Sequence, residues 1–158
     1  MTLRVGQGFD VHPFSEDPSR PLVLGGVVVD GSRGLSGHSD ADVLAHALSD
    51  ALLGAAGLGD IGRHFPDTDP RYAGADSVQL LSRVVGLVAD ARLRAANADC
   101  TLLAERPKLS SLLPAMAERL SGVLGAPVSV KASRGEGLGA IGRAEGIACL
   151  AVVLLDAS

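Results

Sequence analysis

The segment GHSDADVLAH, residues 37–46, predicts the start of a long helix that packs on the core and also carries polar groups. Ser39 is a favoured N-cap residue, and Asp42 three residues later completes a capping box. Neither Pro nor Gly follows until Gly54, so we expect a helix over residues 39–56. Apolar side chains recur at helical spacing along one face, which is expected to lie against the core: Val43, Leu44, Ala47, Leu48, Ala51 and Leu52.

Three polar residues of this region are candidates for chemistry. His46 lies to one side of the apolar stripe, so its imidazole can point along the packed surface. Asp50, one turn later, can reach the same imidazole. His38 precedes the helix, where free N–H groups and the helix dipole attract anions. The alternative interpretations are a core histidine for His46 and an exposed helix carboxylate for Asp50.

Composition limits the class of protein. The chain has 158 residues, 47% of them hydrophobic and 3% aromatic, which predicts one domain over residues 1–158 with an aliphatic core. A net charge of −4 gives no indication of a nucleic-acid partner, and no apolar run reaches membrane-spanning length. Cys100 and Cys149 form no C-x-x-C motif, and no signal peptide precedes them. These features predict reduced thiols and a cytoplasmic location.

Residue patterns predict an α+β (α/β layered) domain, with one mixed β-sheet, helices packed on one face and the element order ββααβαββ. The first two strands are expected to form a hairpin, and the run at 152–155 is expected to be buried on both faces. The expected strands are 3–12, 22–29, 98–104, 128–133 and 146–155, and the expected helices are 39–56, 76–93 and 108–124.

Asp10-Val11-His12 places a carboxylate and an imidazole on one face of a strand, since residues i and i+2 point the same way. Such a pair supplies two ligands for a transition metal, and the alternative is a surface salt bridge near a turn. Adding His46 gives an Asp/His/His set with one position left open, as in catalytic zinc sites. In that arrangement Asp50 would orient the His46 ring.

Two polar loops offer further contacts. The loop over residues 60–69 has backbone amides and carboxylates that suit the hydroxyls of a small polyol, or alternatively a network of caps and turns. The second loop, SRGEGLG at 133–139 followed by GRAEG at 142–146, offers glycine N–H groups and Arg143 to phosphates, and Glu136 to a hard divalent cation. Its spacing matches neither a Walker motif nor a Rossmann fingerprint, and the alternative is a flexible turn with a surface ion pair.

Five stretches resemble one family, the 2-C-methyl-D-erythritol 2,4-cyclodiphosphate synthases. They are GQGFDVHPF (6–14), GHSDADVLAHALSDALLGA (37–55), LGDIGRHFPDTDPRYAGADS (58–77), AERPKL (104–109) and GRAEGIA (142–148), so the resemblance covers essentially the whole chain. It implies an enzyme of the non-mevalonate route to isoprenoid precursors. Such an enzyme converts 4-diphosphocytidyl-2-C-methyl-D-erythritol 2-phosphate to the cyclic diphosphate and releases CMP. It also implies a homotrimer with active sites between subunits.

The resemblance implies roles for individual residues. Asp10, His12 and His46 correspond to zinc ligands, and Glu136 to the ligand of a magnesium or manganese ion between the phosphates. His38 and Arg134 correspond to positions that act in catalysis. The positions that correspond to the substrate site are Asp10, His12, His38, Ser39, Asp60, Ile61, Gly62, Phe65, Pro66, Asp67, Thr68, Asp69, Ala104, Glu105, Arg106, Pro107, Lys108, Leu109, Ser110, Ser133, Arg134, Gly135, Glu136, Ala140 and Arg143.

The chain departs from the family pattern at two positions of the implied substrate site. Arg134 stands where the family has a threonine that contacts phosphate in the transition state, and Ala140 stands where phenylalanine is common. Two other functions fit the same residues. One is a metal-dependent phosphohydrolase that uses the Asp/His/His site with water as nucleophile, and the other is a zinc-stabilised binding module without catalysis.

Overall fold

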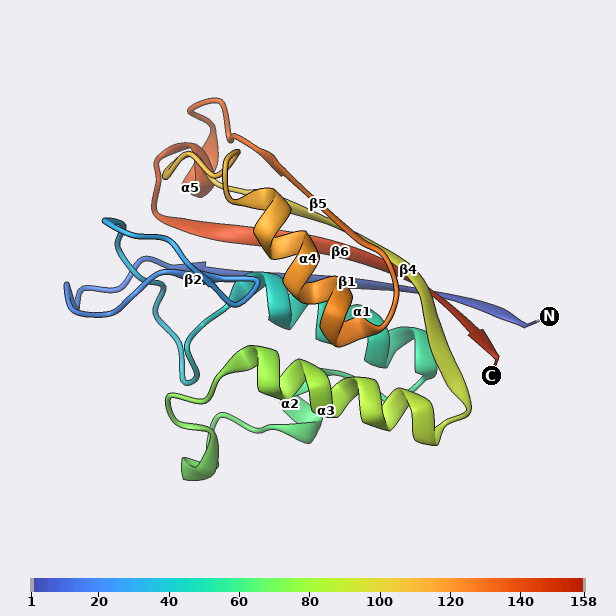
Figure 1. Ribbon diagram of the computed structural model, residues 1–158. Coiled ribbons are helices and arrows are strands. Elements are labelled where there is room, and N and C mark those ends of the chain that lie inside the picture. Colours follow the sequence, from blue (N-terminus) through green and yellow to red (C-terminus); the bar gives the residue numbers. More distant parts are fainter. Residues whose placement is uncertain (1, 158) are drawn as a thin grey trace.

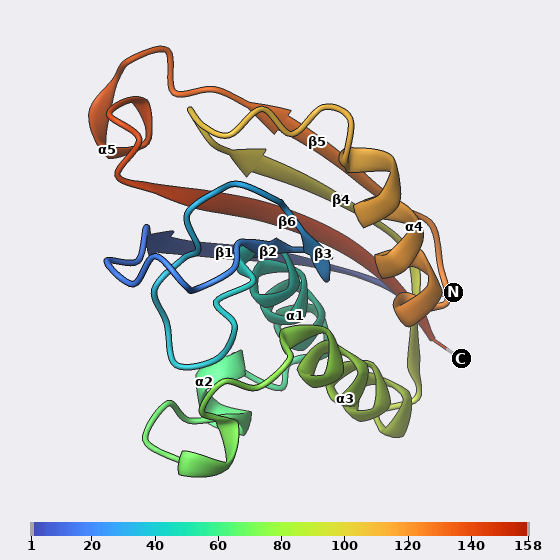
Figure 2. The same cartoon turned by 60° about the vertical axis from the view of Figure 1, so that its left-hand side comes forward.

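The computed structural model describes residues 2–157 and has an α+β architecture in which helices cover one face of a mixed sheet (Figure 1). The long helices are α1 (Val43–Ala56), α3 (Ser77–Asp90) and α4 (Leu113–Leu124), and all three lie on the same side of the sheet (Figure 2). The sheet consists of β1 (Leu3–Pro13), β4 (Leu93–Leu103), β5 (Val128–Ser133) and β6 (Gly146–Ala157). The predicted mixed sheet with helices on one face is therefore confirmed.

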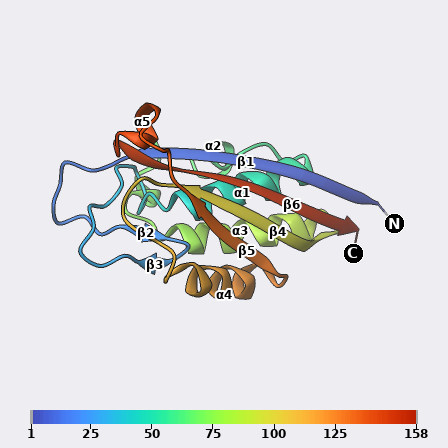
Figure 3. The ribbon, with the colours of Figure 1, turned by 90° about the horizontal axis from the view of Figure 1, so that it is seen from above.

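The strands lie in the order β1-β6-β4-β5 (Figure 3). β4 and β5 are parallel, and the other two neighbouring pairs are antiparallel. The remaining elements are short: β2 (Val23–Leu24), β3 (Val27–Val28), α2 (Ile61–His64), the 3₁₀ turn η1 (Pro70–Tyr72) and α5 (Gly139–Gly142).

The predicted hairpin between residues 3–12 and 22–29 is wrong. β1 instead pairs with β6 along its whole length, whereas β2 and β3 form a separate small ladder around a turn at residues 25–26. Leu22 and Leu24 are fully buried in the core. The β2–β3 segment is therefore anchored by its buried leucines and contributes no strand to the main sheet.

Helix α1 begins four residues later than predicted, because Asp42 and not Ser39 is its N-cap. The Asp42 carboxylate accepts from the backbone N–H groups of Leu44 and Ala45, each at 3.1 Å. It also accepts from the two glycines of the β2–β3 turn, at 2.9 and 2.7 Å. This fully buried side chain therefore joins the turn to the helix.

Other element boundaries also differ from the sequence-based expectation. Helix α3 ends at Asp90 and not at 93, because Arg92 has φ +60° and starts the turn into β4. β4 consequently begins five residues earlier than predicted, at Leu93. Helix α4 begins at Leu113 with Pro114 in its first turn, and residues 108–112 remain outside it. The strand predicted over 128–133 is confirmed.

β1 and α1 pack so closely that two positions in β1 admit only glycine. A Cβ atom at Gly6 would lie 1.9 Å from the carbonyl O of Ala51, and one at Gly8 would lie 1.8 Å from the carbonyl O of Ala47. This contact brings the far end of β1 alongside the first turns of α1, where the predicted metal ligands lie.

The sheet face that the helices leave uncovered is apolar near β1 and β6. Its exposed side chains are Leu3, Val5, Phe9, Val11, Leu150 and Val152. Val152 is 46% exposed while Val153 and Leu155 are buried, so the prediction of a strand buried on both faces is wrong for a single chain.

The two cysteines are free, as the absence of a C-x-x-C motif predicts, and both are buried. Both lie in the central strands, Cys100 in β4 and Cys149 in β6. Within residues 2–157, every helix is too short or too polar to cross a membrane.

Candidate active site

Asp10, His12 and His46 converge where β1 and α1 meet, as the sequence predicts. Asp10 Oδ2 lies 3.0 Å from His12 Nε2 and 3.0 Å from His46 Nδ1. One ligand atom from each residue lies within 4.8 Å of the other two. A carboxylate oxygen and two imidazole nitrogens are the ligands of catalytic zinc sites. The group is therefore able to hold a metal ion.

The His12 ring is fixed by a bond on its other nitrogen. His12 Nδ1 donates to the carbonyl O of Ser36 at 2.7 Å. Because a carbonyl only accepts, this bond places a proton on Nδ1, so Nε2, on the side of Asp10, is the ring nitrogen that can bind a metal in place of a proton. In metal-binding histidines, the ring nitrogen that does not bind the metal commonly donates such a hydrogen bond.

The prediction that Asp50 orients His46 is wrong. Asp50 Oδ1 accepts from the backbone N–H of Ile61 at 2.7 Å, and so holds the start of α2. Two hydroxyls take its place, because His46 Nε2 lies 2.8 Å from Ser77 Oγ and 3.1 Å from Ser39 Oγ. Sequence reasoning did not select Ser77, which lies 31 residues from His46 and belongs to another helix.

The pKa values of two ligands reflect this arrangement. Burial alone would raise the pKa of Asp10, but its interactions with His12 and His46 outweigh burial and hold that pKa well below its usual range. The hydrogen bond with Asp10 raises the pKa of His12 above the ordinary 6.5, although burial opposes the shift. The two imidazoles thus favour the ionised form of Asp10, which is the form that binds a metal cation.

The three ligands line a cavity of about 450 Å³. Seven further predicted residues line it: His38, Ser39, Ile61, Gly62, Phe65, Pro66 and Asp67. Gly37, Tyr72 and Leu80, which were not predicted, complete its wall. Within residues 2–157, the predicted contacts Asp60, Thr68 and Asp69 lie outside this lining.

Two carboxylates of the acidic loop serve local structure. Asp60 is the N-cap of α2 and Asp69 is the N-cap of η1, as the capping alternative predicts. The backbone carbonyl O of Asp69 lies 3.0 Å from His38 Nε2, which ties the histidine to the loop. Asp67 lines the cavity, so it is the loop carboxylate best placed to meet a ligand.

Arg20 supports the segment that carries His38 and Ser39. Its Nη2 donates to the carbonyl O of Gly37 at 3.0 Å and also to the carbonyl O of Ser39. Sequence reasoning did not select Arg20, because no spacing rule joins a polar loop to a segment 17 residues later.

A second cavity, of about 460 Å³, lies in the predicted nucleotide segment. The predicted residues that line it are Ala104, Glu105, Arg106, Pro107, Lys108, Leu109, Ser110, Ser133 and Arg134. Glu105 joins its two loops: Oε1 accepts from Arg134 Nη2 at 2.8 Å, and Oε2 accepts from the N–H of Gly135 at 2.9 Å.

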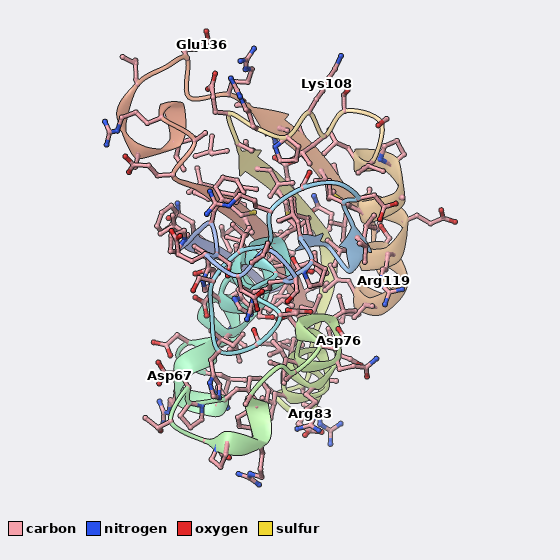
Figure 4. All side chains as sticks on the ribbon, turned by 90° about the vertical axis from the view of Figure 1, so that its left-hand side faces the viewer. Asp67, Asp76, Arg83, Lys108, Arg119 and Glu136 are labelled. Carbon is pink, nitrogen blue, oxygen red and sulfur yellow. The ribbon has the colours of Figure 1, made fainter. Side chains whose placement is uncertain are left out.

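Glu136, Ala140 and Arg143 lie on the exposed loop around α5. Arg143 Nε donates to Glu145 Oε1 at 2.7 Å, which agrees with the surface-ion-pair alternative. Figure 4 shows Glu136 and Lys108 at one end of the molecule and Asp67 toward the other. The two cavities share no lining residue and are therefore separate within one chain.

Comparison with known proteins identifies the family. The model of the YgbB family matches residues 3–156. The chain belongs to the YgbB family. A relative of this YgbB chain, the 2-C-methyl-D-erythritol 2,4-cyclodiphosphate synthase of Symbiobacterium thermophilum, is 58% identical over 156 residues, which cover 97% of this chain and 98% of that protein.

Solved structures of similar proteins share the fold. The bifunctional IspDF of Campylobacter jejuni matches with a TM-score of 0.94 and 44% identity over 99% of this YgbB-family chain, which spans 43% of that longer protein. The CDP complex of IspF from Plasmodium falciparum matches with a TM-score of 0.84 and 32% identity, over 99% of this chain and 97% of that one.

Proposed function

We propose that this protein is an enzyme that converts 4-diphosphocytidyl-2-C-methyl-D-erythritol 2-phosphate to 2-C-methyl-D-erythritol 2,4-cyclodiphosphate. An oxygen of the 2-phosphate attacks the β-phosphorus, the bond from that phosphorus to the oxygen bridging to the α-phosphate breaks, and CMP leaves with this oxygen. The observation that carries the proposal is the convergence of Asp10, His12 and His46 at a cavity, in a chain 58% identical to a synthase of that name.

An intramolecular phosphoryl transfer needs in-line placement and neutralised charge, and no nucleophilic side chain. Asp10, His12 and His46 would hold zinc, which supplies Lewis acidity at a phosphate oxygen when it is bound. His38 and Ser39 line the same cavity and bind the substrate's phosphates. The wall from Ile61 to Asp67 receives the methylerythritol part, whose hydroxyls suit backbone amides and a carboxylate.

The second cavity takes the cytidine part of the substrate. The CDP complex of the Plasmodium falciparum relative supports a cytidyl-diphosphate ligand for this fold. Residues 104–110 surround the base, Lys108 contacts the CMP phosphate, and Arg143 pairs with a substrate phosphate. Glu136 would hold magnesium or manganese, because an exposed carboxylate suits a hard divalent cation between phosphates. Arg134 supplies charge where the family has a threonine.

A homotrimer would join these two parts. Cavities that share no residue within one chain support a site completed by a neighbouring subunit. The exposed apolar face of β1 and β6 supports an interface between copies, since Val5 is 70% exposed and Phe9 is 54% exposed. Sedimentation of the purified protein tests this assembly. Free buried thiols at Cys100 and Cys149 support the proposed cytoplasmic location.

The deciding experiment incubates the protein with the cytidyl substrate, with and without a chelator. Phosphorus NMR and chromatography should show CMP and a cyclic diphosphate in equal amounts, and chelator should stop the reaction. A phosphohydrolase with the same Asp/His/His site would instead give inorganic phosphate or two open-chain products. A zinc-stabilised binding module would give no product and would unfold when metal is removed.

Two variants test the roles of residues in that assay. His46→Ala should lose bound zinc and activity, because one of the three metal ligands is removed. The variant should still fold, since His46 lies at the cavity wall. Gly54→Ala, on the same helix but exposed, is the matched control. Arg134→Ala should lower kcat more than it raises KM. Equal kinetics for Arg134→Ala and the wild type would show that Arg134 has no role in the reaction.

A further inference from the structure

A line of hydrogen-bonded side chains leads from the candidate metal site to the start of α3. His46 Nε2 lies 2.8 Å from Ser77 Oγ, and Ser77 Oγ donates in turn to Asp40 Oδ1 in a short hydrogen bond. Asp40 is not among the residues that line the cavity within the described chain, and neither is Ser77. Ser77 therefore contacts His46 from outside the cavity, and Asp40 acts on the ring only through Ser77.

The direction of each bond follows from which groups can donate. Ser77 is the donor and Asp40 Oδ1 the acceptor of their bond, so the hydroxyl proton of Ser77 points to Asp40. Ser77 Oγ is then left with lone pairs toward His46, and the proton between them must belong to His46 Nε2. An imidazole that donates from Nε2 has Nδ1 as its metal-binding nitrogen, and Nδ1 lies 3.0 Å from Asp10 Oδ2, where a bound metal would take the place of the proton in that hydrogen bond.

Ser39 offers a second hydroxyl at 3.1 Å from His46 Nε2, but its bonds leave it less suited to accept from the ring. Ser39 Oγ already accepts from the backbone N–H of Ala41 at 3.2 Å. It also lies 3.1 Å from Ser77 Oγ, to which its own proton can be donated. The closer contact of the imidazole is with Ser77.

Backbone hydrogen bonds hold Ser77 and Asp40 in place. Ser77 is fully buried at the first position of α3, and its backbone N–H donates to Asp40 Oδ2 at 3.1 Å. Asp40 also accepts from the N–H of Asp42 at 3.1 Å, and its own N–H donates to the carbonyl O of Ala75 at 3.0 Å. Asp40 thus fixes Ser77 relative to the segment that precedes α1.

We propose that Ser77 and Asp40 are positioning residues that fix the His46 ring with Nδ1 directed at the metal. The proposal rests on the metal site assigned under the proposed function. His12 receives the equivalent support from the carbonyl O of Ser36, so the two imidazoles present different nitrogens to one point. Support of this kind for a metal-binding histidine is typically worth about 10–100-fold in metal affinity.

The test measures cobalt(II) binding by the full-length protein in competition with a chromogenic chelator, together with the visible spectrum of the bound cobalt. Ser77→Ala should bind cobalt at least about tenfold more weakly, with an altered spectrum, because the ring loses its fixed orientation. Ser49→Ala is the matched control. Ser49 is equally buried, and its hydroxyl donates only to the carbonyl O of Ala45, at 2.8 Å, among the described contacts. It should bind cobalt like the wild type.

Thermal unfolding of the metal-free proteins is measured first, because Ser77 begins a helix. If Ser77→Ala is unfolded, Asp40→Asn, which keeps the shape of the side chain, is measured in its place and should also weaken binding. Wild-type affinity and spectrum in the folded variant would overturn the proposal, as would an equal loss in Ser49→Ala. Absence of cobalt binding by the wild type itself would instead refute the metal site on which the proposal rests.

Discussion

Replacing Gly8 by alanine should separate β1 from α1 and so damage both stability and the metal site. The added Cβ would lie 1.8 Å from the carbonyl O of Ala47, whereas Cβ atoms essentially never approach closer than 3.0 Å. The backbones must therefore move apart by at least about 1.2 Å, since neither atom is on a flexible side chain. Overpacking of this severity is expected to cost about 3 kcal/mol of unfolding free energy.

The same displacement acts on the candidate metal ligands. Asp10 and His12 belong to β1 and His46 belongs to α1, so movement of either element separates them. Metal sites tolerate deviations of only about 0.2 Å in ligand distance. A misplacement of about 1 Å can lower a catalytic rate about 100-fold, and we expect a loss of that order for Gly8→Ala.

Urea denaturation and zinc content measured on the same preparation test this reasoning. Gly54→Ala is the control, because its Cβ would meet only the carbonyl O of Gln7, at an ordinary 3.9 Å. That variant should be as stable as the wild type or more stable by up to about 1 kcal/mol, since alanine favours a helix over glycine. A Gly8→Ala protein with wild-type stability and zinc content would refute the tight β1–α1 contact.

Three further predictions concern single side chains. Asp42→Ala should lower the free energy of unfolding by about 3 kcal/mol, since four backbone N–H groups lose their acceptor. A loss below about 1 kcal/mol in urea denaturation would contradict this expectation. Burial raises the pKa of Cys100 to about 12 and also raises that of Cys149, so neither thiol should react with a disulfide reagent at about pH 8 until the protein unfolds. The pKa of His12 is raised, so protons compete with a metal for this side chain at a higher pH than they would for an ordinary histidine. Zinc affinity should therefore fall as the pH drops through that pKa. Equal zinc affinity at about pH 5 and pH 8 would contradict the role of His12 as a metal ligand.

Local patterns predicted much of the candidate site. Asp10 and His12 share a strand face because residues i and i+2 always do, and His46 lies beside the apolar stripe because helical spacing fixes that angle. Their convergence required β1 to lie against α1, which the structure confirms. The N-cap was assigned to the wrong residue because Ser39 and Asp42 are both good caps, and only long-range bonds to residues 25–26 favour Asp42.

The residue pattern alone was enough to predict the helices and strands with strong periodicity, the family, and the residue types able to bind a metal. It did not determine that β1 pairs with β6, that Ser77 and not Asp50 stands behind His46, or that the two cavities are separate within one chain. The reason is physical. Periodicity and capping depend on neighbours within a turn or two, whereas strand pairing and side-chain hydrogen bonds between distant segments depend on which surfaces meet when the whole chain packs.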